Sequence, residues 1–137
     1  MFYAVEPETP YTPIYISQTF EKFGYPLEDW KTNPKIWNEV IHEDDREWVL
    51  DGTLESMARG EGIDFEYRVV GKSGKLFWVR DRGCFIKDKE GKTICWQGVI
   101  LDVTERKVAT DALLESETRY RQLFENANDI IYVHDLA

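Results

Sequence analysis

The fold is decided by residues 63–107, which read IDFEYRVVGKSGKLFWVRDRGCFIKDKEGKTICWQGVILDVTERK. Apolar side chains alternate with charged ones from Ile63 to Val69, and this period of two predicts a strand with one buried face. Glycine-bearing turns at residues 71–74 and 88–91 divide the remaining residues into two further strands. The stretch therefore predicts an antiparallel meander of three strands, at residues 63–69, 76–87 and 93–103.

The first hairpin has one favoured register. Pairing Gly71 with Lys75 sets apolar residues opposite one another on the inner face and opposite charges opposite one another on the outer face. The inner pairs are Val69–Phe77, Tyr67–Val79 and Phe65–Asp81, and the outer pairs are Glu66–Arg80 and Asp64–Arg82. Asp81 is the exception on the inner face. A lone carboxylate would be costly there, so we expect Asp81 to have a partner or a ligand.

The second hairpin leaves two registers open, which differ by one residue and bury opposite faces of the last strand. A three-residue loop ending at Gly91 would turn inward Cys95, Gln97, Val99 and Leu101. Pairing Asp88 with Gly91 buries a bulkier apolar set, Ile94, Trp96, Gly98 and Ile100. We prefer this second register. It also sets Cys84 directly opposite Cys95, and we expect both thiols to be reduced.

The N-terminal residues predict short elements separated by prolines. Two short strands and three short helices are expected, at residues 2–6, 14–16, 19–23, 27–30 and 35–41. A longer helix ends at Gly60, and Asp44 with Glu47 forms a variant of the capping box at its start. We interpret His42 and the acidic residues after it as this capped turn. A metal or acid–base site is disfavoured because His42 is the only strong soft-metal ligand among them.

The C-terminal residues predict a helix followed by the start of another domain. Residues 104–126 contain neither proline nor glycine, and Leu113, Tyr120 and Leu123 lie on a weak heptad seam. Residues 129–135 carry a new apolar run, Ile130-Ile131-Tyr132-Val133. We interpret this run as the first strand of a domain that the chain does not complete.

Composition and charge exclude several classes of function. The chain has 137 residues, room for one ordinary domain, and 42% hydrophobic residues exclude a disordered chain. A formal charge of -9 disfavours nucleic acid and anionic membranes as partners. No apolar run is long enough to span a membrane, and the first ten residues lack the pattern of an export signal. We therefore expect a cytoplasmic protein that contacts neither nucleic acid nor membrane.

Several segments resemble the PAS domain with its C-terminal PAC motif, and the resemblance covers residues 2–107. The segments are Tyr15-Ile16-Ser17, Phe23-Gly24-Tyr25, Ile41-His42-Glu43-Asp44-Asp45-Arg46, Phe65-Glu66-Tyr67-Arg68, residues 74–82 and Asp102-Val103-Thr104-Glu105-Arg106-Lys107. The resemblance implies an α+β fold, with a five-stranded antiparallel sheet, short helices on one face and a C-terminal signalling helix. Residues 1–103 would form the PAS core, 104–125 an amphipathic linker helix, and 126–137 the truncated start of a second PAS domain.

The resemblance also implies a function. Such a module senses a small ligand or a partner and relays a conformational change through its C-terminal helix to a signalling output. The parent protein would be a sensor histidine kinase more often than a diguanylate cyclase. Two other hypotheses stay open: a purely structural dimerisation spacer with a filled core, and a small α+β enzyme that uses Asp81. We expect no catalysis by this chain, a homodimer, and further PAS and output domains in cis.

The resemblance narrows the choice of cofactor without naming one. Light-sensing, flavin-binding PAS relatives carry an Asn-Cys-Arg motif near the middle helices, whereas neither cysteine here precedes residue 84. Haem-binding relatives usually take an axial histidine from the long helix, and residues 45–59 contain none. Covalent flavin photochemistry and haem are therefore not expected. The pocket is expected to hold a small metabolite, a non-covalent flavin or nothing.

Three groups of residues are the candidate sites, and none of their members is assigned to catalysis or to a metal. The ligand pocket is assigned to the inner face: Phe65, Tyr67, Val79, Asp81, Trp96, Gly98 and Ile100. The signal relay is assigned to Asp102, Thr104 and Arg106, with Arg80 or Arg106 as the salt-bridge partner of Asp102. The partner surface is assigned to apolar residues of the outer face and the helix: Trp78, Val99, Leu101, Leu113, Tyr120 and Leu123.

Overall fold

The computed structural model describes the backbone of residues 1–136 and the side chains of residues 1–125. The chain divides into two units, Met1–Val103 and Thr104–Ala137. Its elements are β1 (Phe2–Val5), β2 (Pro13–Ile16), the 3₁₀ helix η1 (Gln18–Phe23), α1 (Leu27–Thr32), α2 (Ile36–Val40), α3 (Glu43–Ala58), β3 (Ile63–Val70), β4 (Leu76–Lys87), β5 (Thr93–Asp102) and α4 (Thr104–Leu136). From β1 to the start of α4 the order of strands and helices is the predicted one.

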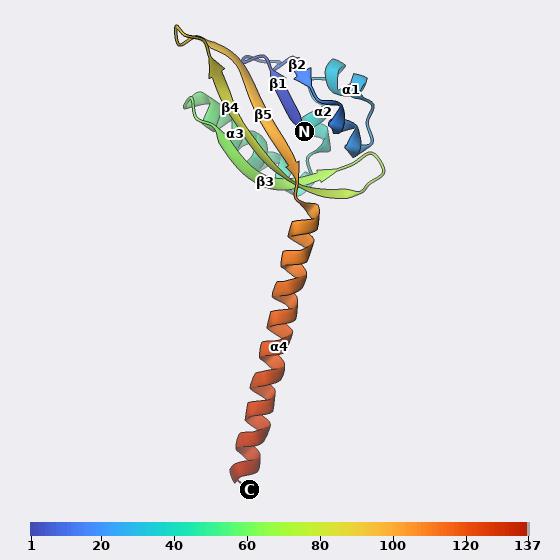
Figure 1. Cartoon of the computed structure of the whole chain (residues 1–137), viewed down its shortest axis with the longest axis vertical. Helices are drawn as coiled ribbons and strands as arrows, with labels where there is room; N and C mark the ends of the chain where they lie inside the picture. Colours follow the sequence, from blue (N-terminus) through green and yellow to red (C-terminus); the bar gives the residue numbers. More distant parts are fainter. Residues whose placement is uncertain (137) are drawn as a thin grey trace. The chain divides into compact units, whose positions relative to one another are not determined.

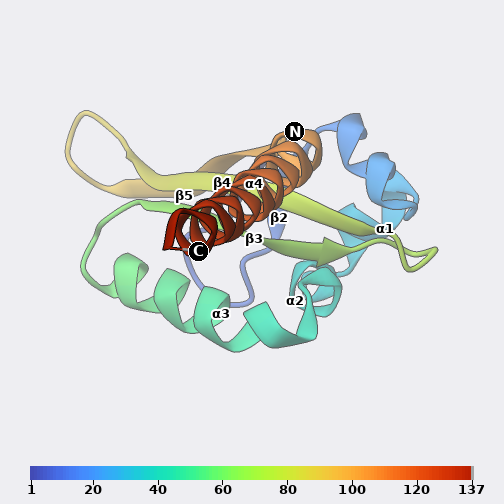
Figure 2. The same cartoon turned by 90° about the horizontal axis from the view of Figure 1, so that it is seen from below.

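One antiparallel sheet organises the first unit, with its strands in the order β2-β1-β5-β4-β3. The first and last strands pair at its centre, because β1 lies between β2 and β5 (Figure 1). Figure 2 shows α2 and α3 along one face of this sheet. The predicted α+β class, with a five-stranded antiparallel sheet, is confirmed.

The core lies between the sheet and the helices that cover it. The sheet contributes buried residues at every second position, as the period of two predicts. The helices contribute aromatic and aliphatic side chains in equal number. The buried cluster consists of Phe20, Phe23, Trp30, Ile36, Val40, Ile41, Val49, Tyr67, Val69, Phe77, Val79 and Ile100.

The first hairpin has the predicted register. Phe65 lies opposite Asp81, and all the other expected pairs between β3 and β4 are formed. On the outer face Arg80 binds Asp64 through two guanidinium nitrogens, each 2.8 Å from a carboxylate oxygen. The side chain of Arg82 lies 3.5 Å from the same carboxylate. Alternation and charge pairing were therefore sufficient to fix this register.

The second hairpin has the three-residue turn ending at Gly91, the alternative that was not preferred, but beyond the turn it follows neither of the two registers considered. Cys84 lies opposite Gln97 and Cys95 lies opposite Ile86, so the prediction that the two cysteines face each other is wrong. Both are free thiols. The prediction that Ile94 is buried is also wrong, since 53% of its surface is exposed.

Two irregularities explain the observed register. The turn leaves three residues between Asp88 and Lys92, whose carbonyl accepts the Asp88 N–H at 2.8 Å, and Gly91 takes a left-handed φ of 84°. A second shift, between Ile86 and Lys87, leaves Ile94 without a partner on β4. The longer turn and the shift at Ile86 each move the pairing by one residue relative to the preferred register. A slip of one residue exchanges the two faces of a strand, so two slips restore the original direction of the side chains. Trp96, Gly98 and Ile100 therefore still face inward, as predicted, and only Ile94 of the predicted set does not.

Helix α3 begins at Glu43, and its capping residue differs from the predicted one. His42 is the N-cap, and its Nδ1 accepts the backbone N–H of Asp44 at 3.1 Å. The prediction that Asp44 caps this helix is therefore wrong. An imidazole nitrogen can accept the same backbone N–H that a carboxylate would.

Helix α4 continues to Leu136, because no glycine or proline interrupts it after Thr104. The strand expected at residues 129–135 is therefore not formed, and the backbone there is helical. The side chains of residues 126–137 lie outside the described part of the chain, and their assignment to a second PAS domain stays a prediction. Within the described residues, no helix has the length and apolar content that a membrane span requires.

Candidate functional site

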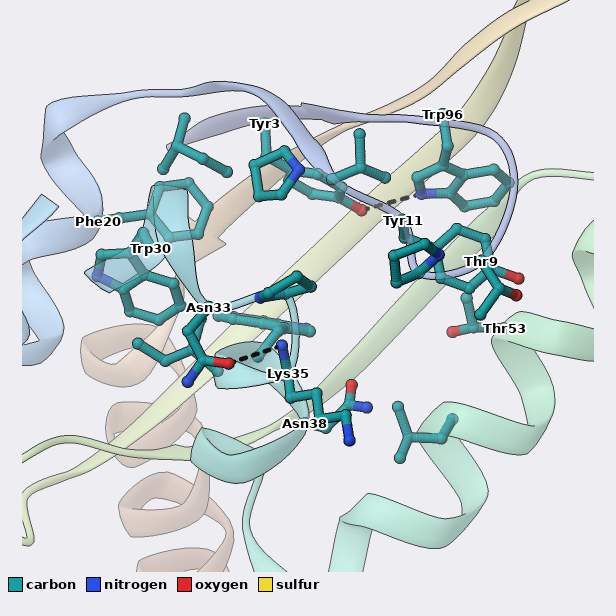
Figure 3. Close-up of a pocket in the computed structure, with 18 of the residues that line it drawn as sticks. Tyr3, Thr9, Tyr11, Phe20, Trp30, Asn33, Lys35, Asn38, Thr53 and Trp96 are labelled. Atoms are coloured by element: carbon teal, nitrogen blue, oxygen red, sulfur yellow. Dashed lines mark hydrogen bonds between the residues drawn. The ribbon is translucent and has the colours of Figure 1, made fainter. Parts of the chain in front are cut away.

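A cavity of about 650 Å³ lies between the sheet and the helices (Figure 3). Strands β1, β2 and β5 and the β1–β2 loop contribute to its lining, together with η1, α1, α2 and α3. Six aromatic side chains line it: Tyr3, Tyr11, Phe20, Trp30, Trp37 and Trp96. A hollow of this size is large enough for a small organic ligand.

Few polar side chains line this cavity. Figure 3 shows Asn33, Lys35 and Asn38 grouped on the α2 side of the hollow, across from Tyr3 and Trp96. The amide oxygen of Asn33 already accepts the backbone N–H of Lys35 at 3.1 Å. An apolar hollow with a few polar groups suits a small, mainly apolar ligand whose orientation those groups fix.

A buried carboxylate lies behind the sheet side of the cavity. Asp81 is 3% exposed and accepts two hydrogen bonds, from the Tyr67 hydroxyl at 2.8 Å and from the Tyr3 hydroxyl at 3.0 Å. Each hydroxyl in turn accepts an indole N–H. Trp37 donates to Tyr67 at 3.1 Å, and Trp96 donates to Tyr3 at 3.3 Å. Asp81 thus has the partners that the sequence analysis required of it, and we call these five side chains the Asp81 network.

Burial sets the protonation of this network. It raises the pKa of Asp81 to about 6, although the hydrogen bonds from Tyr67 and Tyr3 oppose the shift. Burial, helped by the nearby carboxylate, also raises the pKa of both tyrosines well above the ordinary 10.0. The tyrosines therefore stay neutral donors at physiological pH, while Asp81 titrates close to it.

Two glycines make room for the aromatic members of the network. A Cβ on Gly98 would lie 2.4 Å from the Tyr3 hydroxyl oxygen, and a Cβ on Gly83 would lie 2.8 Å from the Trp96 indole. Contacts that short are not tolerated against stiff rings. The positions of Tyr3 and Trp96 beside Asp81 therefore depend on glycine at both sites.

The residues predicted for the pocket divide into two groups. Trp96 and Ile100 line the cavity, and Asp81 adjoins it through Tyr3. Tyr67 and Val79 lie fully buried in the core.

Phe65 and Gly98, the remaining two, also lie outside the lining. Phe65 packs against Trp48, with ring centroids 5.6 Å apart, and Gly98 lies under Tyr3. The structure thus brings together the β5 part of the predicted pocket and leaves most of the β3 part in the core.

The lining residues outside the meander could not be predicted from the sequence. Tyr3, Phe20 and Trp37 come from short elements whose alternation is too brief to show a buried face. One signal was available. Trp30 and Trp37 lie in two short helices, where large aromatic residues indicate a buried or binding surface.

Helix α3 is tied to the sheet by a buried ion pair. Asp45 is 7% exposed and binds the Arg68 guanidinium of β3 through both oxygens, at 2.7 and 2.9 Å. The Arg68 backbone N–H and the Trp48 indole donate to the same carboxylate. The side-chain hydrogen bonds from Arg68 are the largest cause that lowers the pKa of Asp45 to about 2. The sequence analysis assigned Asp45 only to the start of the helix.

The junction between β5 and α4 carries an ion pair that the sequence did not suggest. The carboxylate of Asp102 lies 2.5 Å from the ammonium of Lys22 on η1. Arg80, one of the two partners expected for Asp102, instead binds Asp64. Val103 donates its N–H to the Trp78 carbonyl at 2.8 Å, and α4 begins at the next residue, Thr104.

The predicted partner surface lies partly in each unit. On the outer face of the sheet Val99 and Leu101 are 41% and 50% exposed, while Trp78 is half-buried under the Arg68 guanidinium, 5.6 Å from its ring centroid. On α4 the side chains of Leu113, Tyr120 and Leu123 are exposed. Their role in binding a partner stays a prediction.

Neither cysteine lines the cavity. Cys84 lies on β4 and is exposed, and Cys95 lies on β5 and is half-buried. Among residues 1–125, whose side chains are described, no three His, Cys, Asp or Glu side chains are grouped so that they could hold a metal ion.

Residues 13–100 match a family model described as the PAS fold. The chain is also 32% identical over 105 residues to the methyl sulfide methyltransferase-associated sensor of Methanosarcina acetivorans. That match covers 73% of this chain and 10% of the sensor, so the chain spans only a small part of its relative's length.

Two solved structures have the same fold. A sensory box histidine kinase/response regulator from Burkholderia thailandensis E264 is 32% identical, with a TM-score of 0.64, over 88% of this chain and 89% of that one. The N-terminal domain of a diguanylate cyclase with a PAS/PAC sensor, from Marinobacter aquaeolei, is 23% identical, with a TM-score of 0.69, over 77% of this chain and 96% of that one.

Proposed function

The chain belongs to the PAS family of sensory modules, and from this premise we propose that it binds a small, mainly apolar ligand in the cavity of the first unit and relays binding through β5 to α4. The observation that carries the proposal is the position of β5. This strand contributes Trp96 and Ile100 to the cavity lining and ends at Asp102, two residues before α4 begins.

The shape and chemistry of the cavity support ligand binding. Its volume of about 650 Å³ lies in the range of small-molecule sites, and most of its lining is apolar. A purely structural spacer needs no such hollow, because protein interiors otherwise pack to the density of organic crystals.

Filling the cavity is expected to abolish binding. Thr53 of α3 lines it and is half-buried, so Thr53→Phe would project a ring into the hollow. We expect the affinity for the neutral fluorescent probe N-phenyl-1-naphthylamine to fall at least about tenfold. The matched control is Leu76→Phe on β4, which adds an aromatic ring outside the cavity. Equal probe affinity in the two variants would exclude the cavity as the binding site.

The junction supports the relay. The Lys22–Asp102 ion pair ties the end of β5 to η1, which contributes Phe20 to the cavity lining. The hydrogen bond from Val103 to Trp78 ties the same point to β4. A displacement of β5 would therefore reach the start of α4 without a flexible hinge between them, since neither glycine nor proline lies there.

Asp102→Ala is expected to leave the first unit folded while uncoupling the output of the full-length protein from its ligand. The reason is that this substitution frees the end of β5 from Lys22. The measurement is output activity with and without ligand, next to thermal unfolding. Asp64→Ala is the control, because it removes an ion pair from the outer face without touching the junction. Ligand regulation that survives in the Asp102 variant would refute the relay.

The output is proposed to be that of a sensor histidine kinase, with a diguanylate cyclase as the alternative. Both kinds of protein occur among the similar solved structures.

We further propose that the module acts as a homodimer. The exposed residues Leu113, Tyr120 and Leu123 of α4 support this, because they lie on one heptad seam suited to a parallel coiled coil. Cross-linking of the full-length protein carrying Tyr120→Cys, with Cys84→Ser and Cys95→Ser, tests the seam.

A further inference from the structure

While Asp81 is ionised, the Asp81 network commits the side-chain hydrogen-bond donors of its four aromatic members. The Tyr3 and Tyr67 hydroxyls both donate to the carboxylate. The indoles of Trp96 and Trp37 donate to those hydroxyls. Three of these four donors, those of Tyr3, Trp37 and Trp96, belong to residues that line the cavity. A ligand with an acceptor oxygen would find none of them available.

Protonation of Asp81 changes this arrangement. A neutral carboxyl group carries one O–H, which must donate to an acceptor, and the acceptors within reach are the two tyrosine oxygens. The tyrosine that accepts this hydrogen bond can no longer donate to the same carboxyl oxygen. Its own hydrogen then needs a new acceptor.

Tyr3 and Tyr67 differ in where that hydrogen can go. Tyr67 has no exposed surface and does not line the cavity, so it remains the donor to the second carboxyl oxygen. Tyr3 lines the cavity, and Figure 3 shows it beside Trp96 on the sheet side of the hollow. The hydroxyl that can turn toward a ligand is therefore that of Tyr3.

We propose that protonation of Asp81 frees the Tyr3 hydroxyl to donate a hydrogen bond to an acceptor oxygen of the ligand, so that binding takes up one proton from solvent. The ligand class is thus a mainly apolar molecule with a carbonyl or ether oxygen. This inference rests on the proposed function, because it assumes that the cavity binds a ligand. No covalent bond other than the new O–H of Asp81 forms or breaks.

The surroundings of Asp81 place this switch near pH 6. The polar groups that face it are the hydroxyls of Tyr3 from β1 and Tyr67 from β3, and the Cys84 thiol of β4 adds a weaker interaction with Tyr3. Burial raises the pKa of Asp81 to about 6. Because ligand binding takes up a proton, affinity is highest below this pH and falls as the pH rises through it.

Two neutral probes of the same shape test the inference. 2-Acetylnaphthalene carries a carbonyl oxygen, and 2-ethylnaphthalene lacks it. By equilibrium dialysis at pH 5.5 and 7.5, we expect the ketone to bind about fivefold more tightly at the lower pH, the worth of one hydrogen bond. The hydrocarbon is expected to bind equally at both.

Two variants test the donor role of Tyr3 and the titration of Asp81, and they are expected to change ketone affinity in opposite directions. Tyr3→Phe removes the donor, so ketone binding should stay at the weak value at both pH values. Asp81→Asn keeps a neutral side chain whose amide can donate to Tyr3, so ketone binding should stay at the tight value at both. A variant in which both histidines are replaced, His42→Asn together with His134→Gln, is the control, and its pH dependence should match the wild type.

The other possible results distinguish failure of the proton-linked switch from failure of ligand binding itself. If both probes share one pH profile, or if Asp81→Asn keeps the dependence of the wild type, the inference is overturned and the proposed function stands. If neither probe binds at any pH between 5 and 8, the proposed function fails, and the inference fails with it.

Discussion

Replacing Asp81 with asparagine is expected to remove a pH dependence of about 3 kcal/mol from the free energy of unfolding. In the folded protein burial raises the pKa of Asp81 from 3.8 to about 6. Between these two values the folded state therefore binds more protons than the unfolded chain. The wild-type protein should accordingly lose stability as the pH rises from about 4 to about 6, and the loss should be complete above that.

The measurement is urea unfolding of the wild-type protein and of Asp81→Asn at a series of pH values. The difference between them is the quantity of interest, because other carboxyl groups titrate equally in both. As the pH rises from 4 to 7, the wild-type protein should lose about 3 kcal/mol of its free energy of unfolding relative to the variant. A constant difference would show that Asp81 does not titrate as a buried acid.

Asp45→Asn is expected to lower the free energy of unfolding by about 2 kcal/mol at neutral pH, because it removes the near partner of Arg68 and leaves only the exposed Asp44, 4.0 Å away. Hydrogen bonds from Arg68 lower the pKa of Asp45 from 3.8 to about 2. The contribution of this pair is therefore fully present above pH 3.8, and it is lost as the pH falls through 2.

Asp64→Asn provides the matched control, because Asp64 also forms a bidentate pair with an arginine, but on the solvent side of the sheet. Exposed pairs are screened by water and contribute little, so this variant should lose much less stability than Asp45→Asn. Equal losses, measured by the same unfolding experiment at pH 7, would mean that burial of Asp45 does not decide its contribution.

The parts of the fold that could be predicted from sequence are those where two independent patterns agree. The register of β3 with β4 follows from alternation together with two opposite-charge pairs, Glu66–Arg80 and Asp64–Arg82. The second hairpin has no such charge pairs, and its register depends on two irregularities of the backbone. Gly91 indicates the turn, but nothing near Ile94 marks the second shift, so the predicted pairing of the cysteines failed.

The candidate site shows the same division. Asp81 is conspicuous in the sequence as a charge on an apolar face, and the structure gives it the partners that its burial requires. The identity of those partners could not be predicted. Tyr3 reaches Asp81 because β1 pairs with β5, a contact between residues about a hundred positions apart that no local pattern encodes.

The central claim is that a ligand in the cavity changes β5 and the start of α4. Amide hydrogen exchange of the full-length protein, with and without saturating 2-acetylnaphthalene at pH 5.5, tests it most directly. We expect slower exchange in β1, in β5 from Trp96 to Asp102, and in the first turn of α4. Protection confined to α1, α2 and α3, with β5 and α4 unchanged under saturating ligand, would contradict the claim.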